Sequence, residues 1–397
     1  MRGWALGTMG LALACGPAVS VDTASAGGAS GGTFSDTLPP LTSTTQSGPG
    51  GTAAADDDST TFPGQIFDVG GLGTGPPTDE PCNRGWQVDA LHPVVVMVVD
   101  GSSTMVTAMV DHDADPLTEP TSRWFAVRSA LEQSLWDWDA THDVGAVRFP
   151  AAASAPPDRG ACDPDVDLAV PQELGASVVL ETLPEADDSM LAGATPLRGA
   201  LESAWGLLRI VEPGPSRLVV VVTDGAPNCT PGLMPPASFD EVDAQVEVLV
   251  ADMAADEIGV AVISVDVPDA LRGGVDGEPV ANPTAVLDGI AAAGGLYGAA
   301  FDGADTEALI LGLTLIRSTT LSRRLRIPDP SYGWYEIEVD GVVWQQVSDC
   351  TQEDGFVFVA TEAMGERRDV VEMCGAAAGA LERTGTATIY PVCVIAE

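Results

Sequence analysis

Four mostly apolar runs mark the middle of the chain, at residues 93–99, 144–149, 217–223 and 259–265. They are rich in valine and isoleucine, and polar residues do not alternate regularly with apolar ones inside them. Such runs predict strands that are buried on both faces, as in a parallel sheet. A shorter run near residues 297–301 predicts a further strand, and residues 167–170 predict a short edge strand.

Between these runs, apolar residues recur at intervals of three or four, the spacing of one helix face. The clearest stripe comprises Trp124, Val127, Leu131 and Leu135. Helices are predicted at residues 122–137, 174–183, 196–211, 239–255, 283–293 and 305–321. Because strands and helices alternate, the pattern predicts an α/β fold with a doubly wound, mostly parallel sheet.

Three oxygen-bearing side chains follow the first apolar run at alternate positions: Asp100, Ser102 and Thr104. In open α/β sheets, the ligand crevice lies just beyond the carboxyl ends of the strands. A carboxylate and two hydroxyls at that place are hard oxygen donors, which suit a small divalent cation. The pattern therefore predicts a cation site at the end of the first strand.

The spacing resembles the metal-ion-dependent adhesion site of von Willebrand factor A (vWA) domains, Asp-x-Ser-x-Ser, with Thr104 replacing the last serine. Two later segments match the other loops of that family. GATPLRGAL supplies Thr195, and VVVVTDGAPN supplies Asp224 just past the third apolar run. The resemblance covers about residues 90–322, and it implies a vWA, Rossmann-like fold that brings the three loops to one mouth.

The resemblance also implies a site for Mg²⁺, or for Mn²⁺ or Ca²⁺ in its place. Ser102, Thr104 and Thr195 would bind the cation directly, whereas Asp100 and Asp224 would act mostly through water. With few anionic groups in direct contact, the cation stays electrophilic, and it keeps several waters. A carboxylate from a partner protein would then displace one water and complete the shell.

Three functions compete at this stage. The first is a cation-dependent binding module on the cell envelope, for adhesion or envelope assembly. The second is a non-catalytic structural protein of the envelope with an inactive metal site. The third is a phosphohydrolase with Asp100 as nucleophile, but Ser102 stands where a general acid is needed, and no lysine is present to hold a phosphoryl group. We therefore expect a protein that is not an enzyme.

The net charge of the chain limits the classes of partner that it can bind. Asp and Glu number 58 against 17 basic residues, which gives the 397-residue chain a formal net charge of −41. Such a chain repels phosphate backbones and anionic lipid head groups, so nucleic acid is not expected as a partner. Contact with a membrane is expected only through a lipid anchor.

The anchor would lie at the N-terminus. Residues 1–15 combine one arginine with a short apolar run that ends at Cys15, which resembles a lipoprotein export signal. The alternative is a plain cleaved signal with an incidental cysteine. Residues 16–80 are rich in Gly, Ser, Thr, Pro and Asp, which predicts a disordered tether. This combination predicts an exported protein of the envelope, on the outer membrane or surface of a Gram-negative bacterium.

Two folded domains are predicted, a vWA domain at residues 81–322 and a small β-rich domain at residues 323–397. Short alternating runs and an Asp340-Gly341 hairpin turn carry the second prediction. An acidic insert with Asp111, Asp113 and Asp115 follows the first metal-binding segment. We interpret it as a solvated loop in preference to a second cation site, because the glycine and distal glutamate of an EF-hand loop are absent.

Seven cysteines are present, and six remain if Cys15 carries lipid. An even number in an exported chain predicts disulfides, and six cysteines allow fifteen connectivities. We favour a bond between Cys162 and Cys229, because both follow core strands near the predicted metal mouth. Two of the remaining cysteines in the terminal domain are expected to pair with each other, and the third with Cys82; the terminal three are Cys350, Cys374 and Cys393.

Overall fold

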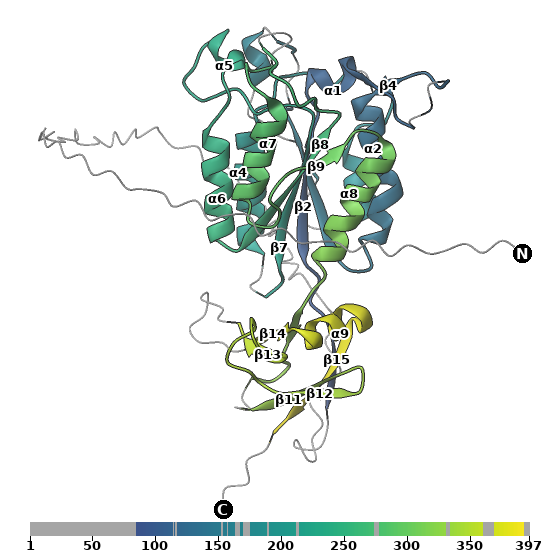
Figure 1. Cartoon of the computed structure of the whole chain (residues 1–397), viewed down its shortest axis with the longest axis vertical. Coiled ribbons are helices and arrows are strands. Elements are labelled where there is room, and N and C mark those ends of the chain that lie inside the picture. The colour runs from purple at the N-terminus through teal and green to yellow at the C-terminus, as the bar shows by residue number, and fades with distance from the viewer. Residues whose placement is uncertain are drawn as a thin grey trace, which may run out of the picture. The chain divides into compact units, whose positions relative to one another are not determined.

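The computed structural model describes residues 85–392, apart from 114, 116, 152–153, 157, 163–166, 170–174, 189, 212–213, 274–277, 331–333 and 360–368. The predicted export signal and tether therefore lie outside the described residues, as do Cys15, Cys82 and Cys393. The described chain forms a larger α/β domain and a smaller domain of two antiparallel sheets (Figure 1).

The larger domain is built on a six-stranded sheet. Five strands are parallel, and β6 pairs antiparallel with β5 at one edge. This confirms the predicted mostly parallel α/β sheet and the predicted edge strand. In spatial order the strands are β6 (Asp167–Ala169), β5 (Asp143–Phe149), β2 (Val94–Asp100), β7 (Arg217–Thr223), β8 (Ile258–Val265) and β9 (Phe301–Gly303).

Strand β2 lies inside the sheet and is buried over its whole length. Its side chains point alternately to two separate apolar clusters, as the two-residue period of a strand requires. Val95, Met97 and Val99 belong to one cluster, and the even-numbered Val94, Val96 and Val98 to the other. Apolar layers on both faces of the sheet thus explain why polar and apolar residues do not alternate in the sequence of this strand.

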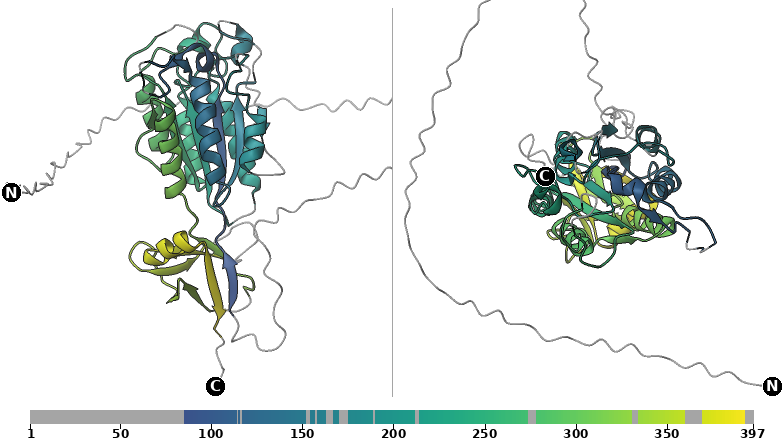
Figure 2. Two further views of the ribbon diagram at one scale, coloured as in Figure 1. Left: turned by 90° about the vertical axis from the view of Figure 1, so that its right-hand side faces the viewer. Right: turned by 90° about the horizontal axis from the view of Figure 1, so that it is seen from above.

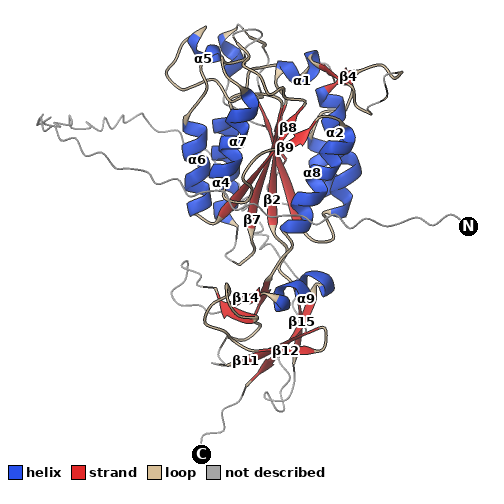
Figure 3. Cartoon of the chain, in the orientation of Figure 1, coloured by secondary structure: helices blue, strands red, loops and turns tan. Residues whose placement is uncertain are grey.

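Helices cover both faces of this sheet (Figures 1 and 3). Figure 2 shows the same arrangement from two further directions. One cluster includes side chains of α2 (Arg123–Ser134), α3 (Ala176–Thr182) and α8 (Thr306–Thr319). The other includes side chains of α4 (Leu197–Ile210), α6 (Gln245–Ala255) and α7 (Pro283–Ala293). Each predicted helix stripe faces the sheet, because an amphipathic helix stabilises the fold by burying that stripe.

Three predicted elements differ from the structure. The helix predicted at residues 239–255 is divided into α5 (Ala237–Asp240) and α6, because the main-chain nitrogen of Asp243 donates to Pro227 O instead of continuing a helix. The strand predicted near residues 297–301 begins only at Phe301, and Tyr297 packs edge-on against that ring. The helix predicted at residues 122–137 ends at Ser134 and continues as the 3₁₀ turn η1 (Leu135–Asp137).

The described residues of the smaller domain form two antiparallel sheets and one helix, α9 (Ala376–Thr384). The four-stranded sheet has the order β1 (Trp86–Asp89), β15 (Thr386–Pro391), β11 (Tyr335–Val339) and β12 (Val342–Trp344). The three-stranded sheet has the order β10 (Arg324–Arg326), β14 (Val370–Cys374) and β13 (Gly355–Phe358). The pairing of Val339 with Val342 confirms the hairpin at Asp340-Gly341.

Strand β1 corrects the predicted domain boundary. We expected residues 81–322 to form one domain, but Trp86–Asp89 pairs with β15 of the smaller domain. The side chains of Trp86 and Val88 pack on the apolar cluster of that domain. The smaller domain is therefore made of two chain segments, and the α/β domain is inserted between them.

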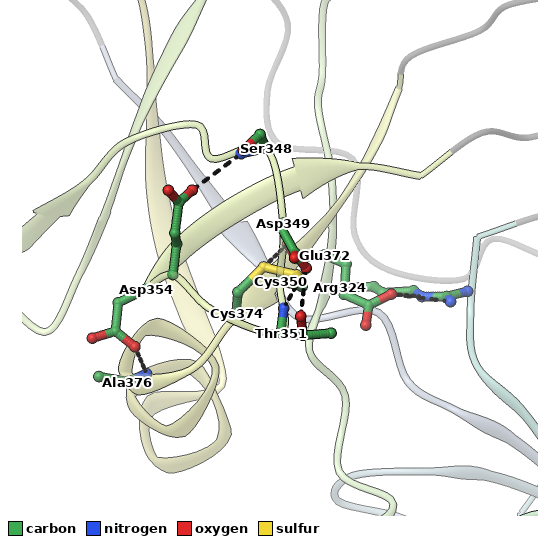
Figure 4. Close-up of a disulfide and its surroundings, with 10 residues drawn as sticks. Arg324, Ser348, Asp349, Cys350, Thr351, Asp354, Glu372, Cys374 and Ala376 are labelled. Atoms are coloured by element: carbon green, nitrogen blue, oxygen red, sulfur yellow. Dashed lines mark hydrogen bonds and ion pairs between the residues drawn. A yellow bond between two sulfur atoms is a disulfide. The ribbon is translucent and has the colours of Figure 1, made fainter.

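A disulfide between Cys350 and Cys374 confirms that two cysteines of the terminal domain pair with each other (Figure 4). Cys350 follows Asp349, whose carboxylate accepts hydrogen bonds from the main chain and hydroxyl of Thr351. Cys374 ends β14, and Gly375 separates it from α9, whose first main-chain N–H donates to Asp354. The bond thus ties a loop of the smaller domain to one of its central strands.

His142 is a buried histidine whose protonation opposes folding. It lies against Trp138, with its ring nitrogens 2.8 Å from Thr141 Oγ1 and 3.1 Å from Thr320 Oγ1. Burial lowers the pKa of His142 to about 4. Because the folded-state pKa is depressed, the neutral form favours folding above the ordinary pKa of 6.5, and this stability is lost as the pH falls towards 4.

We expect wild-type protein to lose about 3 kcal/mol of unfolding free energy through His142 between pH 7.5 and pH 4. His142→Gln retains a side chain that can donate and accept hydrogen bonds but does not titrate. The measurement is urea unfolding of both proteins across this pH range, and the difference between them isolates the histidine. A constant difference from pH 7.5 to pH 4 would show that His142 does not titrate in this way.

Candidate metal centre

Asp100, Ser102 and Thr104 lie where β2 passes into the short helix α1 (Ser103–Thr107). Ser102 is the residue before the helix and has an extended backbone, so the chain turns sharply there. The turn is held by Asp100 Oδ1, which accepts a hydrogen bond from Ser102 N at 2.8 Å. This local bond places the side chains of Ser102 and Thr104 beside each other, with their hydroxyl oxygens 3.0 Å apart.

The loop after β7 joins this group through Asp224. Thr104 Oγ1 donates a hydrogen bond to Asp224 Oδ1 at 2.9 Å, across 120 positions of sequence. Strands β2 and β7 are parallel neighbours, with Val99 opposite Val222, so their carboxyl ends lie at the same edge of the sheet. The structure therefore brings Asp100, Ser102, Thr104 and Asp224 together, as the sequence predicts.

Asp100 is fully buried, and both of its carboxylate oxygens already have partners. Oδ1 accepts from Ser102 N, and Oδ2 accepts from Thr223 Oγ1 at 2.6 Å. The role of Thr223, the last residue of β7, is not apparent from the sequence. Because its two oxygens bind the turn and the neighbouring strand, Asp100 positions the loop.

Thr195 reaches the same region through its main chain. Its N–H donates to Asn228 Oδ1 at 2.9 Å, and its carbonyl accepts from Asn228 N at 3.0 Å. Gly193, two residues earlier, exchanges hydrogen bonds with Ser103. The loop that carries Thr195 is thus tied to both other loops. The Thr195 hydroxyl, however, makes no hydrogen bond to the other four predicted site residues, all of which the structure describes: Asp100, Ser102, Thr104 and Asp224.

Arg123 is a site residue that the sequence analysis missed. It is the first residue of α2, and its guanidinium Nη1 donates to Asp224 Oδ2 at 3.0 Å. The other edge of the guanidinium donates from Nε and Nη2 to the carboxylate of Asp266, and from Nη2 to its carbonyl. A single arginine at the start of a helix has no sequence signature, so only the structure shows this role.

Burial and like charge act together on the two aspartates. Burial, together with the charge of the nearby Asp224, raises the pKa of Asp100 to about 7, against the hydrogen bonds from Thr223 and Ser102. Burial also raises the pKa of Asp224, although Arg123 opposes that shift. Two carboxylates that are buried side by side resist ionisation, and a cation between them would relieve the repulsion.

A disulfide between Cys162 and Cys229 braces the centre, which confirms the favoured pairing. Cys229 directly follows Asn228, the partner of Thr195. On the other side of the bond, Ala161 accepts a hydrogen bond from Ala194 N at 2.8 Å. The bond therefore joins the chain beside the Thr195 loop to the loop that follows β7.

The donor set fits a small divalent cation. In an octahedral shell with metal–oxygen distances of about 2.1 Å, neighbouring ligand oxygens lie about 3.0 Å apart. The separations here are 3.0 Å from Ser102 Oγ to Thr104 Oγ1, and 2.9 Å from Thr104 Oγ1 to Asp224 Oδ1. In the described part of the chain, no group of three or more His, Cys, Asp or Glu side chains is arranged to hold a metal ion. Any cation at the candidate centre therefore relies on hydroxyl oxygens.

The acidic insert forms a loop closed by its own hydrogen bonds. It leaves the larger domain between β3 (Met109–Val110) and β4 (Thr121–Ser122), which pair with each other. Asp113 accepts hydrogen bonds from Asp115 N and from the Thr118 hydroxyl. These bonds lower the pKa of Asp113, chiefly through Thr118. Asp111 and Asp115 are exposed, so the structure describes a solvated loop.

A scan of protein-family models and a search of curated proteins each found no significant match to this chain. Solved structures similar to it include BatB from Bacteroides thetaiotaomicron, with 15% identity over 56% of this chain and 98% of BatB, at a TM-score of 0.35. The pilus adhesin SpaC from Lactobacillus rhamnosus GG has 10% identity over 79% of this chain and 42% of SpaC, at 0.41. Manganese-loaded TRAP protein from Plasmodium vivax has 15% identity over 46% of this chain and 60% of TRAP, at 0.29.

Proposed function

We propose that this chain is a cation-dependent binding module that holds Mg²⁺ or Mn²⁺ at the carboxyl ends of β2 and β7. One observation carries the proposal. Side-chain oxygens from two separate loops meet at Thr104, whose Oγ1 lies 3.0 Å from Ser102 Oγ and 2.9 Å from Asp224 Oδ1, the spacing of neighbouring ligands around one octahedral ion. The resemblance of the three loops to the vWA metal site supports the same conclusion.

In this proposal Ser102, Thr104 and Asp224 would hold the cation, and Thr195, whose loop is tied to Ser103 and Asn228, would supply a further oxygen. When bound, the cation supplies a positive, electrophilic centre for an anionic group of a partner. Asp100 orients the turn through Ser102 N and Thr223. A protein ligand that offers a carboxylate is the partner that this chemistry favours, because three side-chain oxygens leave room for water or one further oxygen.

We propose that the module has no catalytic role. The phosphohydrolase alternative uses Asp100 as a nucleophile, but that side chain is fully buried, and both oxygens are engaged by Ser102 and Thr223. An attacking oxygen needs access to its substrate, which supports a module without this chemistry. A structural protein with an inactive metal site is the alternative, and the cation titration below separates the two.

The export signal and tether of the sequence place this module on the cell envelope in our proposal, with Cys15 as the lipid acceptor. None of the helices that the structure describes is long and apolar enough to cross a bilayer. In this proposal the module serves adhesion or envelope assembly by binding a partner protein through the loaded cation site.

We expect Thr104→Val to lower the affinity for Mn²⁺ about 100-fold, because it deletes one ligand and the hydrogen bond to Asp224. The measurement is a Mn²⁺ titration followed by electron paramagnetic resonance, repeated with Mg²⁺ by competition. Thr107→Val is the matched control, because Thr107 lies on the same helix and bonds only the Ser103 carbonyl. Absence of Mn²⁺ binding by the wild type, or equal affinities for all three proteins, would refute the proposal.

A further inference from the structure

Arg123 is a nearly buried cation that contacts the candidate centre, and it is held from two directions. Its side chain is only 4% exposed, whereas that of Asp266 is 40% exposed. Nη1 contacts Asp224 Oδ2 at 3.0 Å, and Nη2 contacts Asp266 Oδ2 at 2.9 Å. The strands that end at these two carboxylates, β7 and β8, are parallel neighbours. The guanidinium is therefore fixed across two strand ends at the mouth of the site.

The two oxygens of the Asp224 carboxylate have different partners. Oδ2 is occupied by Arg123, and Oδ1 is the oxygen that meets Thr104. Because the guanidinium occupies Oδ2, Asp224 presents only Oδ1 to the hydroxyl groups of Ser102 and Thr104. Because Nε and Nη2 hold the guanidinium against Asp266, its Nη1 is fixed in position, and this contact sets the rotation of the Asp224 carboxylate.

The same contact changes the charge of the site. Asp100 and Asp224 are fully buried and Arg123 nearly so, and together they carry one net negative charge when all three are ionised. Asp266 lies at the opposite edge of the guanidinium and is partly exposed, so solvent screens its charge more strongly. A divalent cation added to this group leaves about one net positive charge. Without Arg123 the loaded site would be close to neutral.

We propose that Arg123 is a specificity-determining residue, which weakens the cation affinity of the site and makes the loaded site select an anionic ligand. This inference rests on the proposed function, because it assigns the cause of the preference for carboxylates. Arg123 repels the metal ion through the field of its buried charge. The same field attracts the carboxylate of a ligand, so the two affinities move in opposite directions when the residue is changed.

The experiment measures two affinities on the full chain. Mn²⁺ binding is followed by electron paramagnetic resonance. Binding of acetate, used as the carboxylate probe, is followed by the water-proton relaxation of the Mn²⁺-loaded protein, because a ligand that displaces metal-bound water lowers the relaxivity. We expect Arg123→Gln to bind Mn²⁺ about tenfold more tightly and acetate about tenfold more weakly than the wild type. Arg123→Lys keeps the charge and should retain most of both wild-type affinities.

Two further variants keep the test decisive. Arg128→Gln removes another buried arginine of α2, which bonds Leu180 O and Pro184 O away from the site, so it should change neither affinity. Asp266→Asn removes the partly exposed counter-charge of Arg123 and should act in the opposite sense, with weaker Mn²⁺ and tighter acetate binding. Asp266→Asn decides the question if Arg123→Gln fails to fold.

The outcomes separate this inference from the proposed function. If the wild type does not bind Mn²⁺, the proposed function fails. If the wild type binds Mn²⁺ and Thr104→Val weakens that binding, but Arg123→Gln and Asp266→Asn shift both affinities in the same direction or neither, the inference about Arg123 alone is overturned. Opposite shifts of Mn²⁺ and acetate affinity in the two variants support it.

Discussion

Asp100→Asn is expected to stabilise the metal-free protein by about 2–4 kcal/mol at pH 8, and to abolish the stabilisation that Mg²⁺ gives the wild type. Burial beside Asp224 raises the pKa of Asp100 to about 7, so ionising it at pH 8 costs folding free energy. Asparagine has nearly the same shape, and its oxygen still accepts from Ser102 N. It carries no charge, however, so a cation meets only the Asp224 carboxylate, which Arg123 already pairs.

The sign of the pH dependence follows from the raised pKa. A carboxyl group whose folded-state pKa is raised favours folding below its ordinary pKa near 3.8, and loses that contribution as the pH rises through 7. The stability of metal-free wild type relative to Asp100→Asn should therefore fall between pH 4 and pH 8. His142 has the opposite slope but is common to both proteins, so it cancels in the difference.

The measurement is urea unfolding in the presence of a chelator, and again with excess Mg²⁺. A ligand at 100 times its dissociation constant stabilises the folded state by about 2.7 kcal/mol, which the wild type should show and Asp100→Asn should not. Asp137→Asn, at an exposed position, is the control. A metal-free Asp100→Asn protein that is less stable than the wild type at pH 8 would show that the carboxylate stabilises the fold by itself.

Removal of the Cys162–Cys229 disulfide, in the variant Cys162→Ala/Cys229→Ala, is expected to cost about 4 kcal/mol of unfolding free energy. The bond closes a chain segment with a sequence separation of 67, and closing a longer loop removes more entropy from the unfolded chain. We also expect weaker Mn²⁺ binding, because the loops that carry Thr195 and Asp224 lose their covalent brace. Urea unfolding and Mn²⁺ titration measure the two effects.

Cys350→Ala/Cys374→Ala is the matched control for this prediction. Its bond has a sequence separation of 24, so its loss should cost a somewhat smaller amount, about 3.5 kcal/mol. It lies in the smaller domain, between a loop and β14, and its removal should leave the Mn²⁺ affinity unchanged. Equal loss of Mn²⁺ affinity in both double variants would mean that general destabilisation, and not the brace, is responsible.

The parts of the site that the sequence predicts are those that follow from one strand and its end. The apolar runs identify β2 and β7, and parallel neighbours bring their last residues to one edge, so Asp100, Ser102, Thr104 and Asp224 could be placed together from the sequence. The Cys162–Cys229 pairing could also be predicted from the sequence, because both cysteines follow core strands near that edge.

The parts that the sequence does not predict depend on contacts between distant segments. Arg123 has no periodic or motif signal, and its role appears only because α2 begins where β7 and β8 end. The apolar stripe runs through residues 239–255, yet Asp243 bonds Pro227 and divides the helix. Strand β1 precedes the α/β domain in sequence, but its partner is β15, some 300 positions later, so no local pattern could assign it.

The most direct measurement is a crystal structure of the Mn²⁺-soaked protein with anomalous scattering recorded at the manganese edge. The account predicts one anomalous peak at the carboxyl ends of β2 and β7, within about 2.3 Å of Ser102 Oγ and Thr104 Oγ1 and in contact with Asp224 Oδ1, directly or through one water. A peak elsewhere in the molecule, or an ordered site with these three side chains and no manganese at saturating concentration, would contradict it.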